Sequence, residues 1–119
     1  MRLFGCTGAI GLFLGVALGA LGAHMLRSQL SSEMLGVYET AVRYQIYHSI
    51  ALLLVAVLFE KRNFFRFAGY LYISGIVLFS GSLYALSLSG GAAFGFITPF
   101  GGLTLLAGHA CLFIGFAMK

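Results

Sequence analysis

Four long apolar stretches, separated by short polar connections, constrain the fold of this chain more than any other feature. Among its 119 residues the stretches cover about 3–26, 37–59, 64–88 and 94–118. A helix needs roughly 20 mostly apolar residues to cross the hydrocarbon core of a bilayer. Each stretch has that length, and no connection is long enough to hold a soluble domain. The sequence therefore predicts a single four-span transmembrane domain.

The composition supports a membrane protein and argues against nucleic-acid binding. Hydrophobic residues make up 61% of the chain and charged residues only 8%, whereas soluble domains carry about 25% charged residues. The net charge of +4 is spread too thinly to neutralise a phosphate backbone. We therefore expect no nucleic-acid partner. Because the connections between the stretches are short, we expect neighbouring helices to run antiparallel in an all-α four-helix bundle.

The distribution of basic residues predicts the orientation in the membrane. In a four-span protein, five basic residues lie on one side and two on the other: Arg2, Lys61, Arg62, Arg66 and Lys119 against Arg27 and Arg43. Cytoplasmic loops carry the excess of lysine and arginine. We therefore expect both termini in the cytoplasm.

Two helix starts can be predicted from their residue types. Ser31 or Ser32 follows the first connection and suits an N-cap, since its hydroxyl can accept a hydrogen bond from the first turn. Pro99, the only proline, suits the first turn of the last helix, where its missing N–H leaves no bond unmade.

Two glycine stripes indicate where helices approach one another closely. The first has four-residue spacing and the second has seven-residue spacing: Gly11, Gly15 and Gly19, then Gly101, Gly108 and Gly115. Small residues allow two helix backbones to come close in a membrane. We favour the interpretation that these glycines pack helices of one chain together. The alternative is that they form the contact between protomers. Independently of this choice, we expect the protein to form a homo-oligomer.

Polar residues gather at the start of the second stretch, where they are costly in so apolar a chain. Glu39 and Arg43 lie four residues apart and can pair on one helix face, which Tyr47 continues. Tyr44 and His48 are also four apart, on another face. With His24 from the first helix, the candidate ligand-binding set is His24, Glu39, Arg43, Tyr44, Tyr47 and His48.

This candidate set supports two interpretations, and the sequence leaves both open. In the first, Arg43 holds Glu39 and the histidines bond to tyrosines or carbonyls, so that the network determines helix packing. In the second, Arg43 supplies a positive charge and the histidines a titratable group, for a small anionic ligand, a lipid head group or a proton.

A metal centre and an enzyme active site are both less well supported. His24, His48, His109 and Glu39 offer nitrogen and oxygen ligands, but no two of them have the three- or four-residue spacing of a helical metal site. The chain also lacks a Gly-x-Ser-x-Gly elbow, a phosphate loop and a dinucleotide fingerprint. We therefore predict no metal, no cofactor and no enzymatic activity.

Four sequence segments resemble a known family along nearly the whole chain. They are Gly19–His24, Glu39–His48, Phe79–Tyr84 and Ile97–Gly102. Together they resemble the domain of unknown function 423 family, which looks related to eukaryotic transmembrane protein 256. The resemblance implies a multi-pass protein of the bacterial inner (plasma) membrane with about four spans. It implies no activity, and His109 is not part of the motif.

The sequence therefore indicates a small integral membrane protein with a structural or accessory role. We expect an outward-facing polar pocket for a lipid or another small ligand, whose identity the sequence does not give. The alternative is an oligomeric channel or transporter for a small solute or ion. That alternative ranks second because a pore needs a polar lining through the full membrane depth, and here the polar residues concentrate in the outer half.

Overall fold

The computed structural model describes all 119 residues as a chain of helices. The long helices are α1 (Arg2–His24), α2 (Ser32–Leu58), α3 (Asn63–Ser89) and α4 (Thr98–Ala117), and two short 3₁₀ turns are η1 (Leu26–Ser28) and η2 (Ala92–Phe96). All four helices, α4 together with η2, are long and apolar enough to cross a membrane. The predicted all-α, four-span fold is confirmed. The largest difference in helix bounds is at α2, which begins at Ser32 rather than at residue 37.

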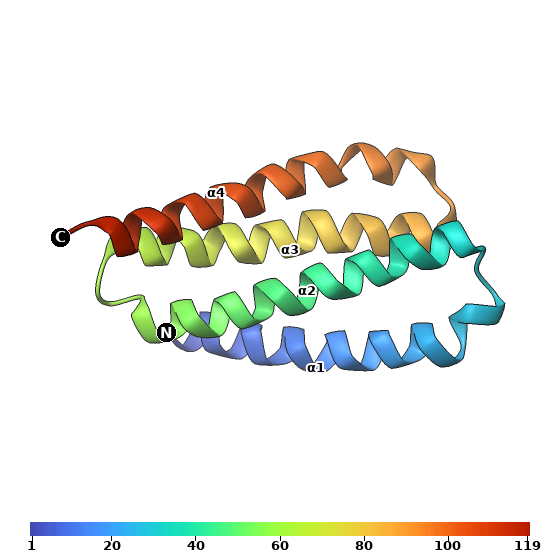
Figure 1. The fold of residues 1–119 in the computed structure, drawn as a ribbon, viewed down its shortest axis with the longest axis horizontal. Helices are drawn as coiled ribbons and strands as arrows, with labels where there is room; N and C mark the ends of the chain where they lie inside the picture. Colours follow the sequence, from blue (N-terminus) through green and yellow to red (C-terminus); the bar gives the residue numbers. More distant parts are fainter.

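The four helices form an open arrangement with α2 and α3 at its centre. Each helix runs antiparallel to the one before it, and α1 packs on α2 while α4 packs on α3 (Figure 1). The outer helices α1 and α4 make no substantial contact with each other. Both termini and the α2–α3 connection lie at one end of the molecule (Figure 1). The bundle therefore does not close around one axis, because its first and last helices do not pack on each other.

The helix ends follow local capping rules. The Ser31 hydroxyl accepts a hydrogen bond from the Met34 backbone N–H at 3.2 Å, which confirms the predicted N-cap of α2. Pro99 lies in the first turn of α4, as predicted. At the end of α3, Gly90 has φ of 70° and its N–H bonds to the Leu86 carbonyl at 2.9 Å. Glycine adopts this left-handed conformation without strain, so it ends the helix.

The largest apolar cluster draws on all four helices. Its buried members are Phe4, Leu52, Val55, Ala56, Ala68, Tyr72 and Leu105. The outward faces of α1 and α4 carry large exposed side chains such as Phe13 and Phe113. In a bilayer these side chains meet lipid tails that are as apolar as they are, so their exposure carries no hydrophobic penalty.

The α1 glycines of the first stripe face α2. A Cβ atom at Gly11 would collide with the Ser49 side chain, and one at Gly15 would lie 2.7 Å from Ile46 Cγ1. Gly19 is less tightly enclosed, since its Cβ would lie 3.3 Å from Val42. Any larger residue at Gly11 or Gly15 would push the two helices apart.

The α4 glycines of the second stripe face α3 in the same way. A Cβ atom at Gly101 would collide with the α3 backbone at Leu78 and Phe79. At Gly108 it would lie 2.8 Å from the Tyr72 ring, and at Gly115 it would lie 2.7 Å from the Phe65 ring. All six predicted packing glycines therefore face another helix of the same chain.

Candidate functional site

The charged members of the candidate set lie on the surface and do not pair. Arg43 Nη2 donates to Thr40 Oγ1 at 3.2 Å, and the structure has no ion pair between Arg43 and Glu39. Both residues are exposed. The prediction of a partly buried Glu39–Arg43 pair is therefore wrong. Their spacing does place them on one helix face, but no neighbouring helix covers that face to hold the pair together.

His24 also lies apart from His48. It is the last residue of α1 and is exposed, at the end of the molecule where α1 connects to α2. His48 lies 16 residues beyond the start of α2, which corresponds to about 24 Å along the helix axis. The predicted cluster therefore divides, and only Tyr44, Tyr47 and His48 lie together.

His48 instead joins a chain of three hydrogen bonds that links α2, α4 and α3. His48 Nδ1 lies 2.7 Å from the Tyr44 carbonyl oxygen, and its Nε2 lies 3.0 Å from His109 Nε2. His109 Nδ1 lies 2.9 Å from the Tyr72 hydroxyl. His48 and Tyr72 are buried, whereas the His109 side chain is exposed.

The direction of each bond follows from the chemistry of its two atoms. A carbonyl oxygen only accepts, so His48 Nδ1–H must donate to Tyr44. A neutral His48 then accepts at Nε2, and His109 Nε2–H donates to it. His109 Nδ1 is left as an acceptor for the Tyr72 O–H. Every imidazole nitrogen has a partner when both rings are neutral.

Sequence reasoning missed the role of His109, although a local signal was present. Its neighbour Gly108 packs directly on the Tyr72 ring, which brings α4 close to α3 at this level. The His109 ring then lies 5.1 Å, between ring centroids, from both the Tyr72 ring and the His48 ring. A polar residue beside a packing glycine was the available signal.

An open groove of about 580 Å³ borders the two histidines. We call it the histidine groove, and its lining residues are Tyr44, Tyr47, His48, Phe79, Gly102, Leu105, Leu106 and His109. No lysine, arginine, aspartate or glutamate lines it. The Tyr44 ring stacks at 5.9 Å on the His48 ring and lies 4.7 Å from the Phe79 ring, so one wall is aromatic.

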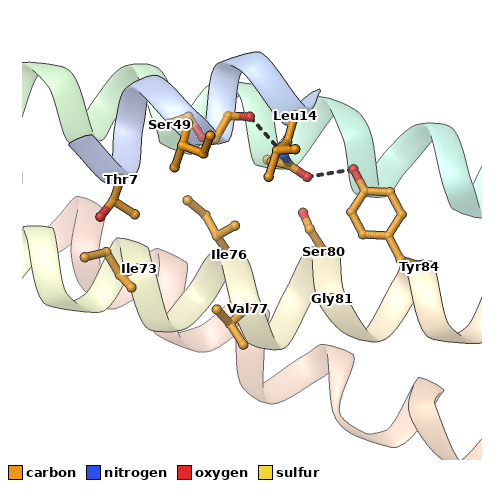
Figure 2. Close-up of a pocket in the computed structure, with 12 residues that line it drawn as sticks. Thr7, Leu14, Ser49, Ile73, Ile76, Val77, Ser80, Gly81 and Tyr84 are labelled. Atoms are coloured by element: carbon orange, nitrogen blue, oxygen red, sulfur yellow. Dashed lines mark hydrogen bonds between the residues drawn. The ribbon is translucent and has the colours of Figure 1, made fainter. Parts of the chain in front are cut away.

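A second groove, of about 330 Å³, lies between α1 and α3 and is also lined by Gln45 and Ser49 of α2. Figure 2 shows Tyr84 and Ser80 of α3 pointing toward α2, with Ile76 between this polar end and Thr7 of α1. Gln45 Nε2 donates to the Gly11 carbonyl at 2.8 Å, and the Tyr84 hydroxyl donates to Gln45 Oε1 at 2.7 Å. This network joins α1, α2 and α3 through one buried amide.

Ser49, also on this groove, is the one buried side chain without a hydrogen-bond partner. It is 0% exposed, and its Oγ atom packs against Gly11 of α1. A buried hydroxyl without a partner costs about 1–3 kcal/mol.

The structure does not assemble the metal-ligand set that the sequence offered. His48 and His109 meet, but His24 is at the exposed end of α1, and Glu39 is exposed near the start of α2. No group of three or more histidine, cysteine, aspartate or glutamate residues is close enough to share a metal ion.

Comparison with known proteins shows the same family along the chain. The family model described as "Protein of unknown function (DUF423)" matches residues 18–102. UPF0382 membrane protein SH2409 of Staphylococcus haemolyticus is 42% identical over 115 residues, 96% of this chain and 94% of that protein. UPF0382 membrane protein YwdK of Bacillus subtilis is 43% identical over 109 residues, 89% of each chain. No solved structure matches.

A third relative supports the location in the cell. UPF0382 inner membrane protein YgdD of Escherichia coli K12 is 41% identical over 109 residues, 90% of this chain and 83% of that protein. Together with four helices able to span a bilayer, this makes the chain a multi-pass protein of the bacterial inner, or plasma, membrane. The chain thus belongs to the DUF423 family of membrane proteins, whose function is unknown.

Proposed function

We propose that this chain is a non-enzymatic accessory protein that holds a small ligand from the membrane in the histidine groove. The observation that carries the proposal is an open groove of about 580 Å³ that has apolar and aromatic walls and two hydrogen-bonded imidazoles. Binding sites for small molecules have this combination of a mostly apolar concave surface and a few polar groups, at volumes of about 300–1,000 Å³.

The depth of the groove supports a ligand that arrives through the lipid. His48 lies 16 residues from the start of α2 and 10 from its end, so it is about 24 Å and about 15 Å from the two helix ends. Leu106 and Tyr47, on the groove walls, are exposed on the side of the molecule. This proposal replaces the outward-facing pocket expected from the sequence with a lateral groove near mid-membrane.

The charges around the groove support a neutral ligand. Arg43, the cation that an anionic ligand would need, does not line the groove and is exposed elsewhere on α2. An anion near mid-membrane without a fixed positive charge would be strongly disfavoured. The groove therefore suits a neutral ligand better than the anionic ligand that the sequence also allowed.

A channel or transporter has less support than a binding role. The hydrogen-bonded chain through the histidines ends at a backbone carbonyl on one side and at the buried Tyr72 hydroxyl on the other. A conducting path would need polar groups that continue toward both membrane surfaces. The alternative is an oligomer with a pore between its protomers. Solute flux through wild-type protein in proteoliposomes that is lost when His109 is replaced would favour this alternative.

The proposed protein has both termini in the cytoplasm and forms a homo-oligomer. We place both termini in the cytoplasm because five of the seven basic residues lie at their end of the spans. A membrane-impermeant thiol reagent tests this on a cysteine added after Lys119, which it should label only in inverted vesicles. A homo-oligomer, measured by light scattering in detergent, would use surfaces other than the glycine stripes, since those face helices of the same chain.

Lipid co-purification tests the binding role. Gly102 lines the groove, and a Cβ there would come no closer than 3.8 Å to another atom, so Gly102→Phe can fill the groove without a backbone clash. Gly36→Phe is the matched control, because Gly36 has open space around it and lines neither groove. Mass spectrometry of purified protein should find a ligand retained by wild type and by Gly36→Phe and lost from Gly102→Phe. Equal retention by all three would refute the proposal.

A further inference from the structure

The two histidines share one hydrogen bond at the edge of the groove, in which one ring donates and the other accepts. His48 Nε2 and His109 Nε2 lie 3.0 Å apart, with His109 as the donor. Both Nδ1 atoms are occupied, by the Tyr44 carbonyl and by the Tyr72 hydroxyl. A ligand therefore finds no unused imidazole nitrogen. It can form hydrogen bonds with the pair only by inserting between the two Nε2 atoms.

Few chemical groups can insert there without leaving a nitrogen unpaired. The group must accept from His109 Nε2–H and donate to His48 Nε2 through a single small atom. A hydroxyl does both, because it carries one O–H and two lone pairs. An ester, ketone or ether oxygen only accepts, so His48 would lose its donor. The ring pair thus selects by hydrogen-bond type as well as by polarity.

We propose that the ligand of the histidine groove is a long-chain alcohol whose hydroxyl bridges His109 Nε2–H and His48 Nε2. This inference rests on the proposed binding role. The Nε2 atoms would separate from 3.0 Å to about 4.5 Å to admit an oxygen with two ordinary hydrogen bonds. His109 has room for this movement because its side chain is exposed and borders the groove.

Charge and size point to the same class of ligand. The lining is uncharged, so a carboxylate, a phosphate or an ammonium group would have no counter-ion near mid-membrane. The volume of about 580 Å³ suits a single chain, since it lies within the range of sites that enclose one drug-sized molecule. Phospholipid head groups lie at the bilayer surface, well away from this depth.

Photolabelling of the full-length protein in nanodiscs tests the inference. The probe is a long-chain primary alcohol with a diazirine in its chain, and the matched probe is its methyl ether, which accepts but cannot donate. Loss of a hydrogen bond to a buried group changes binding on the order of tenfold. We expect the alcohol to label groove peptides on the order of tenfold more than the ether.

Three variants assign that preference to the histidine pair. His109→Phe keeps an aromatic ring at an exposed position and should reduce the alcohol-to-ether ratio to about one. His48→Phe should do the same, with the circular-dichroism spectrum as a check of folding because His48 is buried. His24→Phe removes the exposed histidine outside the groove and should leave the ratio unchanged.

Failure of the inference and failure of the proposed function give different results. If both probes label wild type equally and Gly102→Phe blocks both, the groove binds apolar molecules and the hydroxyl inference is wrong. A preference for the alcohol that survives His109→Phe also overturns the inference. If neither probe labels the groove, the binding role itself is wrong, and the inference falls with it.

Discussion

The contact between α1 and α2 and the contact between α2 and α4 use polar residues in opposite ways. On the α1 side, Gln45 and Tyr38 donate to carbonyl oxygens of α1, at 2.8 Å and 2.5 Å, in an interface lined by glycines. On the α4 side, His48 and His109 bond to each other beside an open groove. Both regions border a groove, but Gln45 is 6% exposed and its amide already bonds to protein through both its nitrogen and its oxygen, whereas the His109 side chain is exposed.

From this difference we propose that the two regions have different roles. A side chain that donates to a carbonyl of another helix has few other partners in lipid, so it favours one register of the two helices. Tyr38, which is 1% exposed, also packs on Gly22. We interpret the α1 side as structural. The α4 side has the accessible polar groups that a ligand can use.

The largest expected effect comes from filling the α3–α4 contact. Gly101→Leu would place a side chain against the α3 backbone at Leu78 and Phe79, and overpacking of this kind costs about 3 kcal/mol or more. We expect loss of the folded protein, measured as thermal aggregation in detergent. The matched control is Gly102→Leu, one residue along, where a Cβ has room. Equal stability of the two variants would show that α4 does not pack on α3 as described.

A smaller loss should follow from removing the buried amide of α2. Gln45→Leu keeps the side-chain size but leaves the Tyr84 hydroxyl without its acceptor and removes the side-chain bond to the Gly11 carbonyl of α1. We expect a loss of about 1–3 kcal/mol in the free energy of unfolding, measured by denaturation in mixed micelles. If Gln45→Leu were as stable as wild type, the structural role that we assign to the α1 side would be wrong.

His109→Phe should cost less stability than Gln45→Leu. It also removes two hydrogen bonds, but the His109 side chain is exposed whereas Gln45 is buried. Water or a ligand at this exposed position can satisfy His48 and so limit the loss to about 1 kcal/mol. The same denaturation measurement compares the two variants directly. A larger loss for His109→Phe would mean that the α4 side, too, is primarily structural.

No loss of stability is expected at Ser49. Its hydroxyl has no hydrogen-bond partner, so Ser49→Ala should leave the free energy of unfolding unchanged or raise it by at most about 1–3 kcal/mol, the cost of an unpaired buried hydroxyl. Thr104→Ala is a useful comparison, because the Thr104 hydroxyl does bond to the Phe100 carbonyl at 2.8 Å. Marked destabilisation by Ser49→Ala would show that the Ser49 hydroxyl does form a stabilising hydrogen bond.

The helices and their ends could be predicted from sequence because they depend on local patterns. Apolar length gave the spans, and the residue types of Ser31 and Pro99 gave two helix starts. Of the six residues predicted to bind a ligand, Tyr44, Tyr47 and His48 line the groove.

The rest of the site depends on how helices meet, which spacing along one helix does not reveal. Four-residue spacing places Glu39 and Arg43 on one face, but it does not say whether another helix covers that face. The bond between His48 and His109 joins residues 61 positions apart. It requires α4 to pack on α3 at the level of Gly108, and that offset cannot be obtained from either helix alone.

The order of α2 and α4 along the chain has a consequence for biogenesis. His48 enters the membrane with α2, well before His109 is synthesised, and α4 meets the rest of the protein through α3 and η2. Until α4 inserts, His48 Nε2 is an acceptor in the membrane without its native donor, which is a costly state in lipid. A chain that lacks α4 thus carries an unpaired polar group inside the membrane, and the arrival of His109 removes that defect.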